Sequence, residues 1–85
     1  MPFVLNRKFR RRLNKKPPKM RDAVMRTIAK LDEDPKRPGL RVHQVEGTHG
    51  VWEASIDDAN RLTFEREGDL LIILNSCNHH ILRNA

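Results

Sequence analysis

Three histidines and one arginine draw attention in this sequence because together they could cleave a phosphodiester bond. His43 and Arg61 lie in stretches of alternating polarity, and His79 and His80 follow the most apolar run of the chain. Cleavage of RNA by its own 2′-hydroxyl needs a base, an acid and a cation that stabilises the phosphorane. Imidazole suits the two proton transfers because its ordinary pKa lies near neutrality, and guanidinium can bind phosphate through two N–H groups.

The strands that must position these residues are expected in the second half of the chain. Polar and apolar residues alternate in three segments, separated by tight turns: 40–45, 51–56 and 61–66. Short connections in succession predict an antiparallel meander. The last strand begins with five consecutive large aliphatics, Leu70 to Leu74, and such a run is typical of a strand buried on both faces.

Alternation divides the side chains of the meander between two faces. One face receives apolar residues that would contact a helix layer: Trp52, Ala54, Ile56, Leu62 and Phe64. The opposite face receives polar residues: Arg41, His43, Glu53, Ser55, Arg61 and Thr63. Successive residues of a strand point to opposite sides, so only one of His79 and His80 can join His43 there. Arg61 has a purely structural alternative, a cross-strand pair with Glu53 or Glu65.

Two amphipathic helices are expected before the strands. Asn6 can cap a helix over 7–16, which has only Phe9 and Leu13 as apolar contacts and should lie on the outside. A second helix over 18–32 carries a regular apolar stripe: Met20, Val24, Ile28 and Leu31, widened by Ala23 and Thr27. The short connection through two prolines makes the pair an antiparallel hairpin.

These elements predict a single α+β domain over residues 1–85. The helix hairpin should pack on one face of a mainly antiparallel four-stranded sheet. Residues 2–5 are short and apolar enough for an additional strand at the sheet edge.

Charge is unevenly distributed along the chain. Up to Arg41 there are 14 Lys and Arg against four acids, and from Val42 onward three Arg against seven acids, which agrees with the net charge of +6. Such clustering favours a polyanion partner such as nucleic acid or a ribonucleoprotein, the alternative being a solvated basic helix pair. The residues expected to contact RNA or the ribosome are Arg7, Lys8, Arg10, Arg11, Arg12, Lys15, Lys16, Lys19 and Arg41.

Other classes of protein find less support. No apolar stretch approaches the roughly 20 residues of a membrane span, and no apolar segment follows the basic N-terminus as in a signal peptide. The single cysteine, Cys77, cannot form an internal disulfide and is expected in the core, which favours a cytoplasmic protein. The histidines lack the spacing of known metal motifs, so neither a metal nor a cofactor is expected.

Several short motifs follow one another from Asp34 almost to the end of the chain. They are Asp34-Pro35 with Pro38-Gly39-Leu40-Arg41, Val45-Glu46-Gly47 with Gly50-Val51-Trp52-Glu53-Ala54, Arg61-Leu62-Thr63-Phe64, Gly68-Asp69-Leu70 and Asn78-His79-His80. In their order and spacing, and with a basic helix hairpin before a meander, they resemble the RelE/ParE superfamily of bacterial type II toxins.

The resemblance implies a toxin that enters the ribosomal A site, cuts bound mRNA and is held inactive by a cognate antitoxin. His43 falls at the position of a catalytic histidine in YafQ-like members, and His79 falls at their C-terminal histidine, the implied general acid. Arg61 matches an arginine that many members carry. The implied mechanism is metal-independent, with His43 as base, His79 or its neighbour His80 as acid, and Arg61 on the phosphate.

The sequence also departs from the family. Ser55 stands where YafQ-like members have another histidine, Ile81-Leu82-Arg83 takes the place of an aromatic residue, and the sheet half contains no lysine. Two other functions therefore stay open. One is a ParE-like protein that inhibits DNA gyrase without cutting RNA, and the other is an inactive member that acts only by binding.

Overall fold

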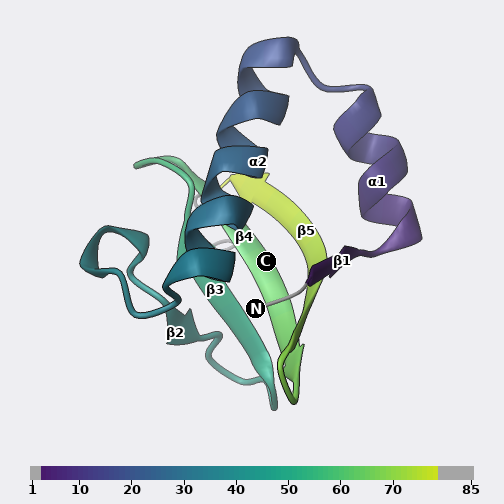
Figure 1. The fold of residues 1–85 in the computed structure, drawn as a ribbon. Coiled ribbons are helices and arrows are strands. Elements are labelled where there is room, and N and C mark those ends of the chain that lie inside the picture. The colour runs from purple at the N-terminus through teal and green to yellow at the C-terminus, as the bar shows by residue number, and fades with distance from the viewer. Residues whose placement is uncertain (1–2, 79–85) are drawn as a thin grey trace.

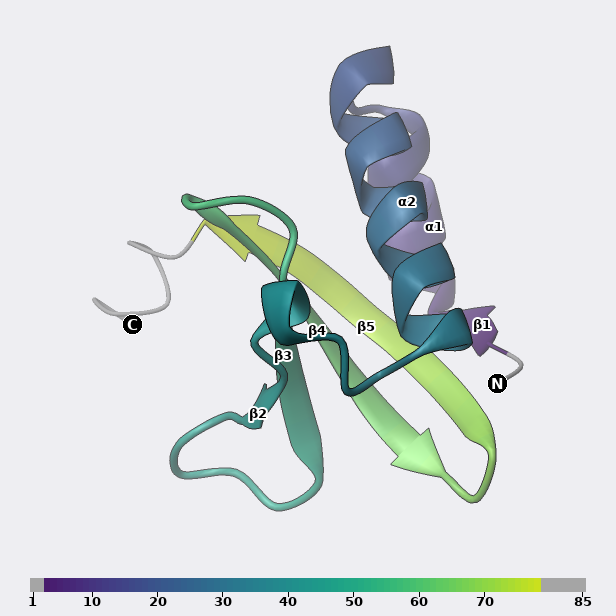
Figure 2. The same ribbon diagram turned by 60° about the vertical axis from the view of Figure 1, so that its left-hand side comes forward.

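Two helices and five strands make up residues 3–78, the part of the chain that the computed structural model describes (Figure 1). In chain order they are β1 (Phe3–Leu5), α1 (Arg7–Asn14), α2 (Pro18–Glu33), the 3₁₀ turn η1 (Pro38–Leu40), β2 (His43–Gln44), β3 (Val51–Ser55), β4 (Asn60–Glu67) and β5 (Leu70–Asn78). Both helices cover the same face of the sheet (Figure 2). The predicted α+β architecture is confirmed.

The helices form where capping and apolar spacing favour them. Asn6 Oδ1 accepts a hydrogen bond of 2.9 Å from the backbone N–H of Lys8, so the predicted cap of α1 is present. α1 buries Phe9 and Leu13, and α2 buries the centre of its stripe: Val24, Thr27, Ile28 and Leu31. Full burial of one large aliphatic side chain contributes about 1.5–3 kcal/mol, so this stripe is what holds α2 on the sheet.

The sheet has the strand order β1-β5-β4-β3-β2. β2 to β5 are antiparallel neighbours, as the meander predicts, while β1 pairs in parallel with β5. The backbone N–H of Asn6 donates to the carbonyl of Ile73 at 2.8 Å, which extends the β1–β5 contact to the start of α1. The sheet therefore has five strands rather than four, and the expected N-terminal edge strand is the fifth.

β2 is shorter than the alternation over residues 40–45 predicts. Pro38–Leu40 form a 3₁₀ turn, and Arg41 follows with a positive φ of 50°. Strand pairing is therefore limited to His43 and Gln44. Leu40 is still buried in the core, as the alternation predicts, although it lies in a turn and not in a strand.

β5 corrects the prediction of a strand buried on both faces. Leu71 and Ile73 are fully buried in the core, whereas Leu70, Ile72 and Leu74 are only half-buried. The helices cover one face of the sheet, and the other face, called the open face below, has no such layer within residues 3–78. An aliphatic run therefore does not require two covered faces.

A β-bulge interrupts the pairing of β4 with β5. Thr63 pairs with Asn75 and Phe64 pairs with Ile73, which leaves Leu74 as an extra residue on β5. One extra residue reverses the alternation of every residue that follows it in the strand.

The bulge explains why the prediction of a core position for Cys77 was wrong. In a strand without a bulge, Cys77 would lie on the same face as the buried Ile73, because strict alternation puts residues four apart on one side. With the bulge at Leu74, Cys77 instead pairs with Arg61 and lies on the open face, where it is half-buried.

Candidate active site

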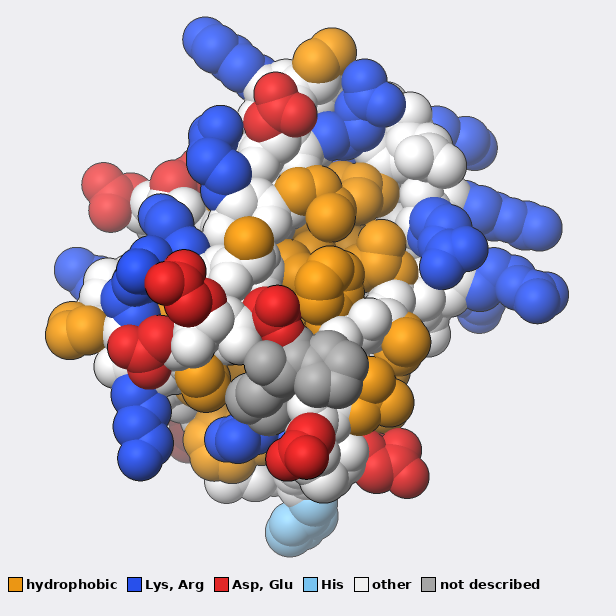
Figure 3. Space-filling model, in the orientation of Figure 1, with side chains coloured by type: hydrophobic (Ala, Val, Ile, Leu, Met, Phe, Trp, Pro, Cys, Tyr) orange, Lys and Arg blue, Asp and Glu red, His pale blue; other side chains and the backbone are white. Residues whose placement is uncertain are grey.

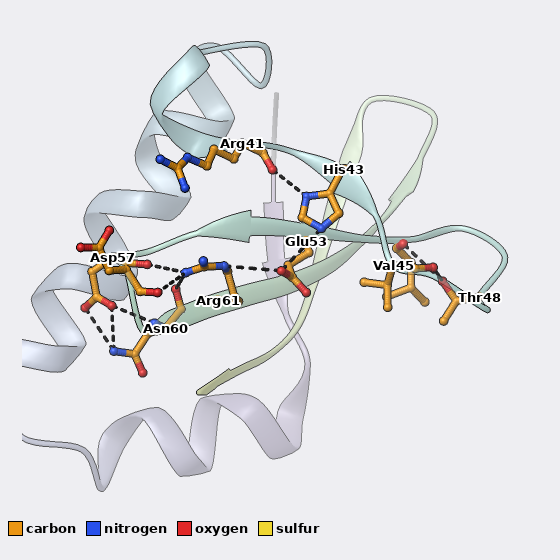
Figure 4. Close-up of polar contacts among 10 residues, drawn as sticks. Arg41, His43, Val45, Thr48, Glu53, Asp57, Asn60 and Arg61 are labelled. Carbon is orange, nitrogen blue, oxygen red and sulfur yellow. Dashed lines mark hydrogen bonds and ion pairs between the residues drawn. The ribbon is translucent and has the colours of Figure 1, made fainter. Parts of the chain in front are cut away.

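Three polar side chains form a row across the open face. Strand pairing sets His43 of β2 opposite Glu53 of β3, and Arg61 of β4 lies on the same face two residue pairs further along, opposite Ser55. His43 Nε2 lies 3.6 Å from Glu53 Oε1, and Arg61 Nε lies 3.5 Å from the same oxygen (Figure 4). The structure thus brings the predicted residues His43 and Arg61 together, with Glu53 between them.

Exposure differs sharply along this row. The side chains of Glu53 and Arg61 are 7% and 10% exposed, whereas that of His43 is 58% exposed. A buried charge without a partner costs several kcal/mol, so Glu53 and Arg61 each compensate the burial of the other. His43 is by far the most exposed member of the row, and Arg61 keeps a small exposed part.

Arg61 is also held by the turn between β3 and β4. Its Nη1 donates to the carbonyl of Asp57, to that of Asp58 at 3.2 Å and to that of Asn60 at 3.1 Å. The cross-strand pair with Glu53, the structural alternative from the sequence, is therefore observed, with additional backbone anchors. Nη2 is the guanidinium nitrogen that lies outside these contacts.

The backbone carbonyl of Arg41 orients His43. His43 Nδ1 lies 2.8 Å from that oxygen. Because a carbonyl can only accept, Nδ1 carries a proton and donates it in this hydrogen bond. Nε2 is then the ring atom available to take up or release a proton, and its distance of 3.6 Å from Glu53 is longer than a hydrogen bond.

Arg41 reaches this position through an unusual backbone conformation. Its φ of 50° and ψ of 45° lie in the left-handed region, which costs about 1–2 kcal/mol for a residue with a Cβ. The conformation turns the Arg41 carbonyl toward His43 while the guanidinium extends the other way (Figure 4). Strain of this kind is often found at functional sites.

Asp57 closes the turn that anchors Arg61. Its Oδ1 accepts hydrogen bonds from the backbone N–H groups of Ala59 at 2.9 Å and Asn60 at 2.8 Å, and from the Asn60 side chain at 3.0 Å. Desolvation acts to raise the pKa of Asp57, but these hydrogen bonds and the charge of Arg61 outweigh it and lower the pKa below the ordinary value of 3.8. An ionised carboxylate therefore holds the turn at neutral pH.

Cys77 lies at the edge of the row without the properties of a nucleophile. Burial raises the pKa of its thiol above 9.0, the charge of Glu53 raises it further, and Lys16 opposes the change. A thiol is reactive as the thiolate, so a raised pKa makes Cys77 a poor nucleophile at neutral pH.

The remaining predicted site residues are distributed as follows. His79 and His80 lie outside the described residues. Arg41 is exposed, Lys16 is half-buried, and the other cations predicted to bind RNA are exposed on or beside the helices: Arg7, Lys8, Arg10, Arg11, Arg12, Lys15 and Lys19. From the sequence, Glu53 was placed on this face only as a possible cross-strand partner of Arg61. Its position opposite His43 in the first hairpin is the signal that could have indicated its contact with His43 as well.

Neither a metal cluster nor a membrane helix is found within residues 3–78. No group of three or more His, Cys, Asp and Glu side chains in that range is arranged to hold a metal ion. None of the helices in the same range combines the length and the apolar character needed to cross a membrane.

Solved structures resemble this chain over almost its whole length. YafQ from Escherichia coli has a TM-score of 0.75 at 12% identity and matches over 94% of both chains. The toxin–antitoxin complex RelBE2 from Mycobacterium tuberculosis has a TM-score of 0.74 at 21% identity, over 92% of this chain and 96% of that chain. The RelB–RelE complex from Methanococcus jannaschii has a TM-score of 0.71 at 15% identity, over 95% of both. No family model and no curated protein sequence matches.

The architecture is thus that of a small α+β domain, with a helix pair on one face of a five-stranded sheet. The chain has the fold of these RelE and YafQ structures, which confirms the fold that the resemblance in the sequence motifs implies. At these identities the likeness establishes the fold, and function has to be argued from this chain's own residues.

Proposed function

We propose that the protein is the toxin of a toxin–antitoxin pair and that it cleaves mRNA on the ribosome. The observation that carries the proposal is His43, an exposed imidazole oriented by a backbone carbonyl beside the buried Glu53–Arg61 pair. The fold adds support because the matched structures include RelE and YafQ.

In this proposal His43 is the base. Its Nε2 accepts the proton of a ribose 2′-hydroxyl, and the nearby Glu53 carboxylate stabilises the imidazolium that forms. The 2′-oxygen attacks the adjacent phosphorus, and the 5′-oxygen of the next nucleotide leaves with a proton from an acid. His79 is the proposed acid, with His80 as its alternative. Neither a metal nor a cofactor takes part.

Arg61 is proposed to stabilise the charge of the phosphorane through Nη2. Its Nε and Nη1 are already fixed by Glu53 and the turn carbonyls, so the guanidinium is ordered before substrate binds. Because Glu53 shares its charge, Arg61 should contribute less to phosphate binding than an exposed arginine would.

The exposed cations of the helices are proposed to bind ribosomal RNA. They belong to the helix layer, whereas His43 and Glu53 lie on the open face of the sheet. Such cations would position the protein on the ribosome and would not contact the scissile bond. Binding should therefore weaken with salt even for a short mRNA.

Expression of the wild type and His79→Ala in cells tests the proposal against its alternatives. Primer extension on cellular mRNA should show cleavage sites for the wild type and their loss for His79→Ala. Equal cleavage by both proteins would remove His79 from the mechanism. Intact mRNA with induced DNA damage would instead identify a gyrase inhibitor of the ParE kind, and neither effect would identify a binding module.

We propose that the antitoxin binds in a groove between the two helices. A groove of about 560 Å³ is lined by Leu5, Arg10, Leu13, Asn14, Arg21, Asp22 and Met25. Figure 3 shows apolar surface in this gap with Lys and Arg side chains around it. An amphipathic helix with acidic flanks fits such a groove, and two of the matched structures are complexes with antitoxins.

Substitution of Met25 tests this surface, since its side chain is 40% exposed in the groove. Met25→Glu should weaken the complex with the cognate antitoxin by roughly tenfold or more, because a charge would replace an apolar contact. Ala29→Glu is the matched control, as Ala29 is exposed on the same helix and does not line the groove. Equal affinity of both variants would place the antitoxin elsewhere.

A further inference from the structure

A second cavity lies under the connection between α2 and β2, apart from both the helix groove and the row on the open face. It has a volume of about 390 Å³, which is within the range of small-ligand pockets. Its cations come from the segment between α2 and β2 and from Arg66 of β4. Its aromatic residues come from β3 and β4. Its lining residues are Pro35, Lys36, Arg37, Pro38, Arg41, Val42, Trp52, Phe64 and Arg66.

The cavity has a strongly positive lining. Four of its residues are cations, Lys36, Arg37, Arg41 and Arg66, and none is an acid. Within residues 3–78 no acidic side chain forms an ion pair with any of these cations. Like charges gathered without a counter-ion repel one another, so an anion bound among them would relieve that repulsion.

The same cavity offers a flat apolar surface. Trp52 is half-buried and packs against the core, so its indole is held in place by the protein, and Phe64 behind it is fully buried. An indole beside arginine and lysine suits a nucleobase with its attached phosphates, because every base has a π-face that can stack. Pro35 and Pro38 restrict the backbone of the cationic segment, which reduces the entropy lost on binding.

We propose that this cavity binds one nucleotide of single-stranded RNA, with the base against Trp52 and its phosphates among the cations. The inference rests on the proposed function and names a substrate subsite for it. Arg41 links the two places: its carbonyl orients His43, and its side chain lines the cavity. His43 and Trp52 lie on opposite faces of the sheet, and β2 is its edge strand. An RNA strand with its scissile bond at His43 therefore has to pass around this edge, beside Arg41, to place a neighbouring nucleotide in the cavity.

The fluorescence of Trp52 gives a direct test because it is the single tryptophan of the chain. The probe is a 2′-O-methyl RNA hexanucleotide, which binds as RNA but has no 2′-hydroxyl to attack the phosphate. Titration should quench Trp52 saturably in the wild type. Lys36→Gln with Arg66→Gln should weaken binding roughly tenfold or more, since a charged hydrogen bond contributes at least that factor. The slope of log affinity against log salt should become shallower by about 0.7 for each phosphate that the variant no longer neutralises.

Matched variants separate this inference from the nuclease proposal. Arg26→Gln with Lys30→Gln removes the same two charges from the exposed surface of α2 and should leave the affinity for the hexanucleotide unchanged. His43→Ala should slow cleavage by about 10²–10⁴-fold and keep the quenching. Quenching that depends on Lys36 and Arg66 in a protein that cleaves no mRNA would support the cavity and refute the nuclease.

Three results would overturn the inference. The first is cleavage by a wild type whose Trp52 shows no quenching. The second is an equal loss of affinity in the cavity variant and the Arg26 and Lys30 control, which would indicate attraction by overall charge. The third is quenching by a poly-glutamate peptide as strong as that by RNA, since the cavity would then bind acidic protein. Urea midpoints of the variants are measured alongside, so that a loss of affinity can be told apart from a loss of folding.

Discussion

Arg61→Met should destabilise the protein far more than Glu53→Gln, although both break the same ion pair. Arg61→Met leaves the carboxylate of Glu53, only 7% exposed, without its buried counter-charge, and it removes the hydrogen bonds to the β3–β4 turn. Removal of one partner of a buried pair costs about 3–5 kcal/mol. In Glu53→Gln, Arg61 keeps its three carbonyl acceptors, so the expected loss is about 1–2 kcal/mol.

Urea unfolding with linear extrapolation measures both losses. A domain of this size has a free energy of unfolding of about 4–13 kcal/mol, so Arg61→Met should shift the urea midpoint by a large fraction of its value. The double variant should be more stable than Arg61→Met alone, because glutamine in place of Glu53 removes the unpaired buried charge. Glu46→Gln serves as the control, since Glu46 is exposed and should change the midpoint little.

Equal losses in the two single variants would refute this reasoning, and so would a double variant no more stable than Arg61→Met. The experiment also decides how any loss of activity in Arg61 variants can be interpreted. If Arg61→Met unfolds, its inactivity says nothing about phosphate binding, and the cleavage rate has to be compared at equal folded fraction. Arg61→Lys is then the informative variant, because it keeps the charge beside Glu53 but cannot span the turn carbonyls.

Three further predictions concern single residues near the sheet. Asp57→Ala should cost about 1 kcal/mol of unfolding free energy at neutral pH. Because folding lowers the pKa of Asp57, the stability linked to this group is present above the unfolded pKa, near 3.8, and is lost as pH falls through the folded pKa. Urea unfolding should therefore show the stabilities of wild type and variant converging in acid. Cys77 should react with iodoacetamide more slowly than free cysteine at about pH 8, because its pKa is raised, and Glu53→Gln should speed the reaction. Gly68→Ala should cost about 1–2 kcal/mol in thermal unfolding, because Gly68 has a φ of 59°, whereas Gly39→Ala should cost less.

Local pattern was sufficient to predict the helices and most of the meander. The spacing of Phe9 and Leu13, and the stripe from Val24 to Leu31, each require one buried helix face. The alternation around Trp52 and Phe64 likewise requires one buried sheet face, and the observed pairing of these two residues follows from it. In each case the burial of a few neighbouring side chains decides the structure.

The features that local pattern did not predict depend on contacts between distant segments. Leu74 is an extra residue only because β4 fixes the positions of Ile73 and Asn75 on either side of it. Arg41, with its left-handed conformation, lies between Leu40, which is buried in the core, and His43, which pairs with β3. No short stretch of sequence contains this information.

The candidate site was predicted in part for the same reason. Alternation placed His43 and Arg61 on one face, and the structure brings them together. It could not show that Glu53 joins them, because that depends on side-chain reach and burial. Trp52 was predicted only as a residue that faces the helices, and its place in a cationic cavity depends on where the segment after α2 folds back.

The cleavage rate of an mRNA bound to purified ribosomes tests the central claim most directly. His43→Ala is compared with His49→Ala, since His49 is an exposed histidine in the turn before β3 and lies outside the row. We predict a wild-type rate for His49→Ala and a loss of about 10²–10⁴-fold for His43→Ala, the usual contribution of a general base. A wild-type rate for folded His43→Ala would contradict the claim that the open face of this sheet is an active site.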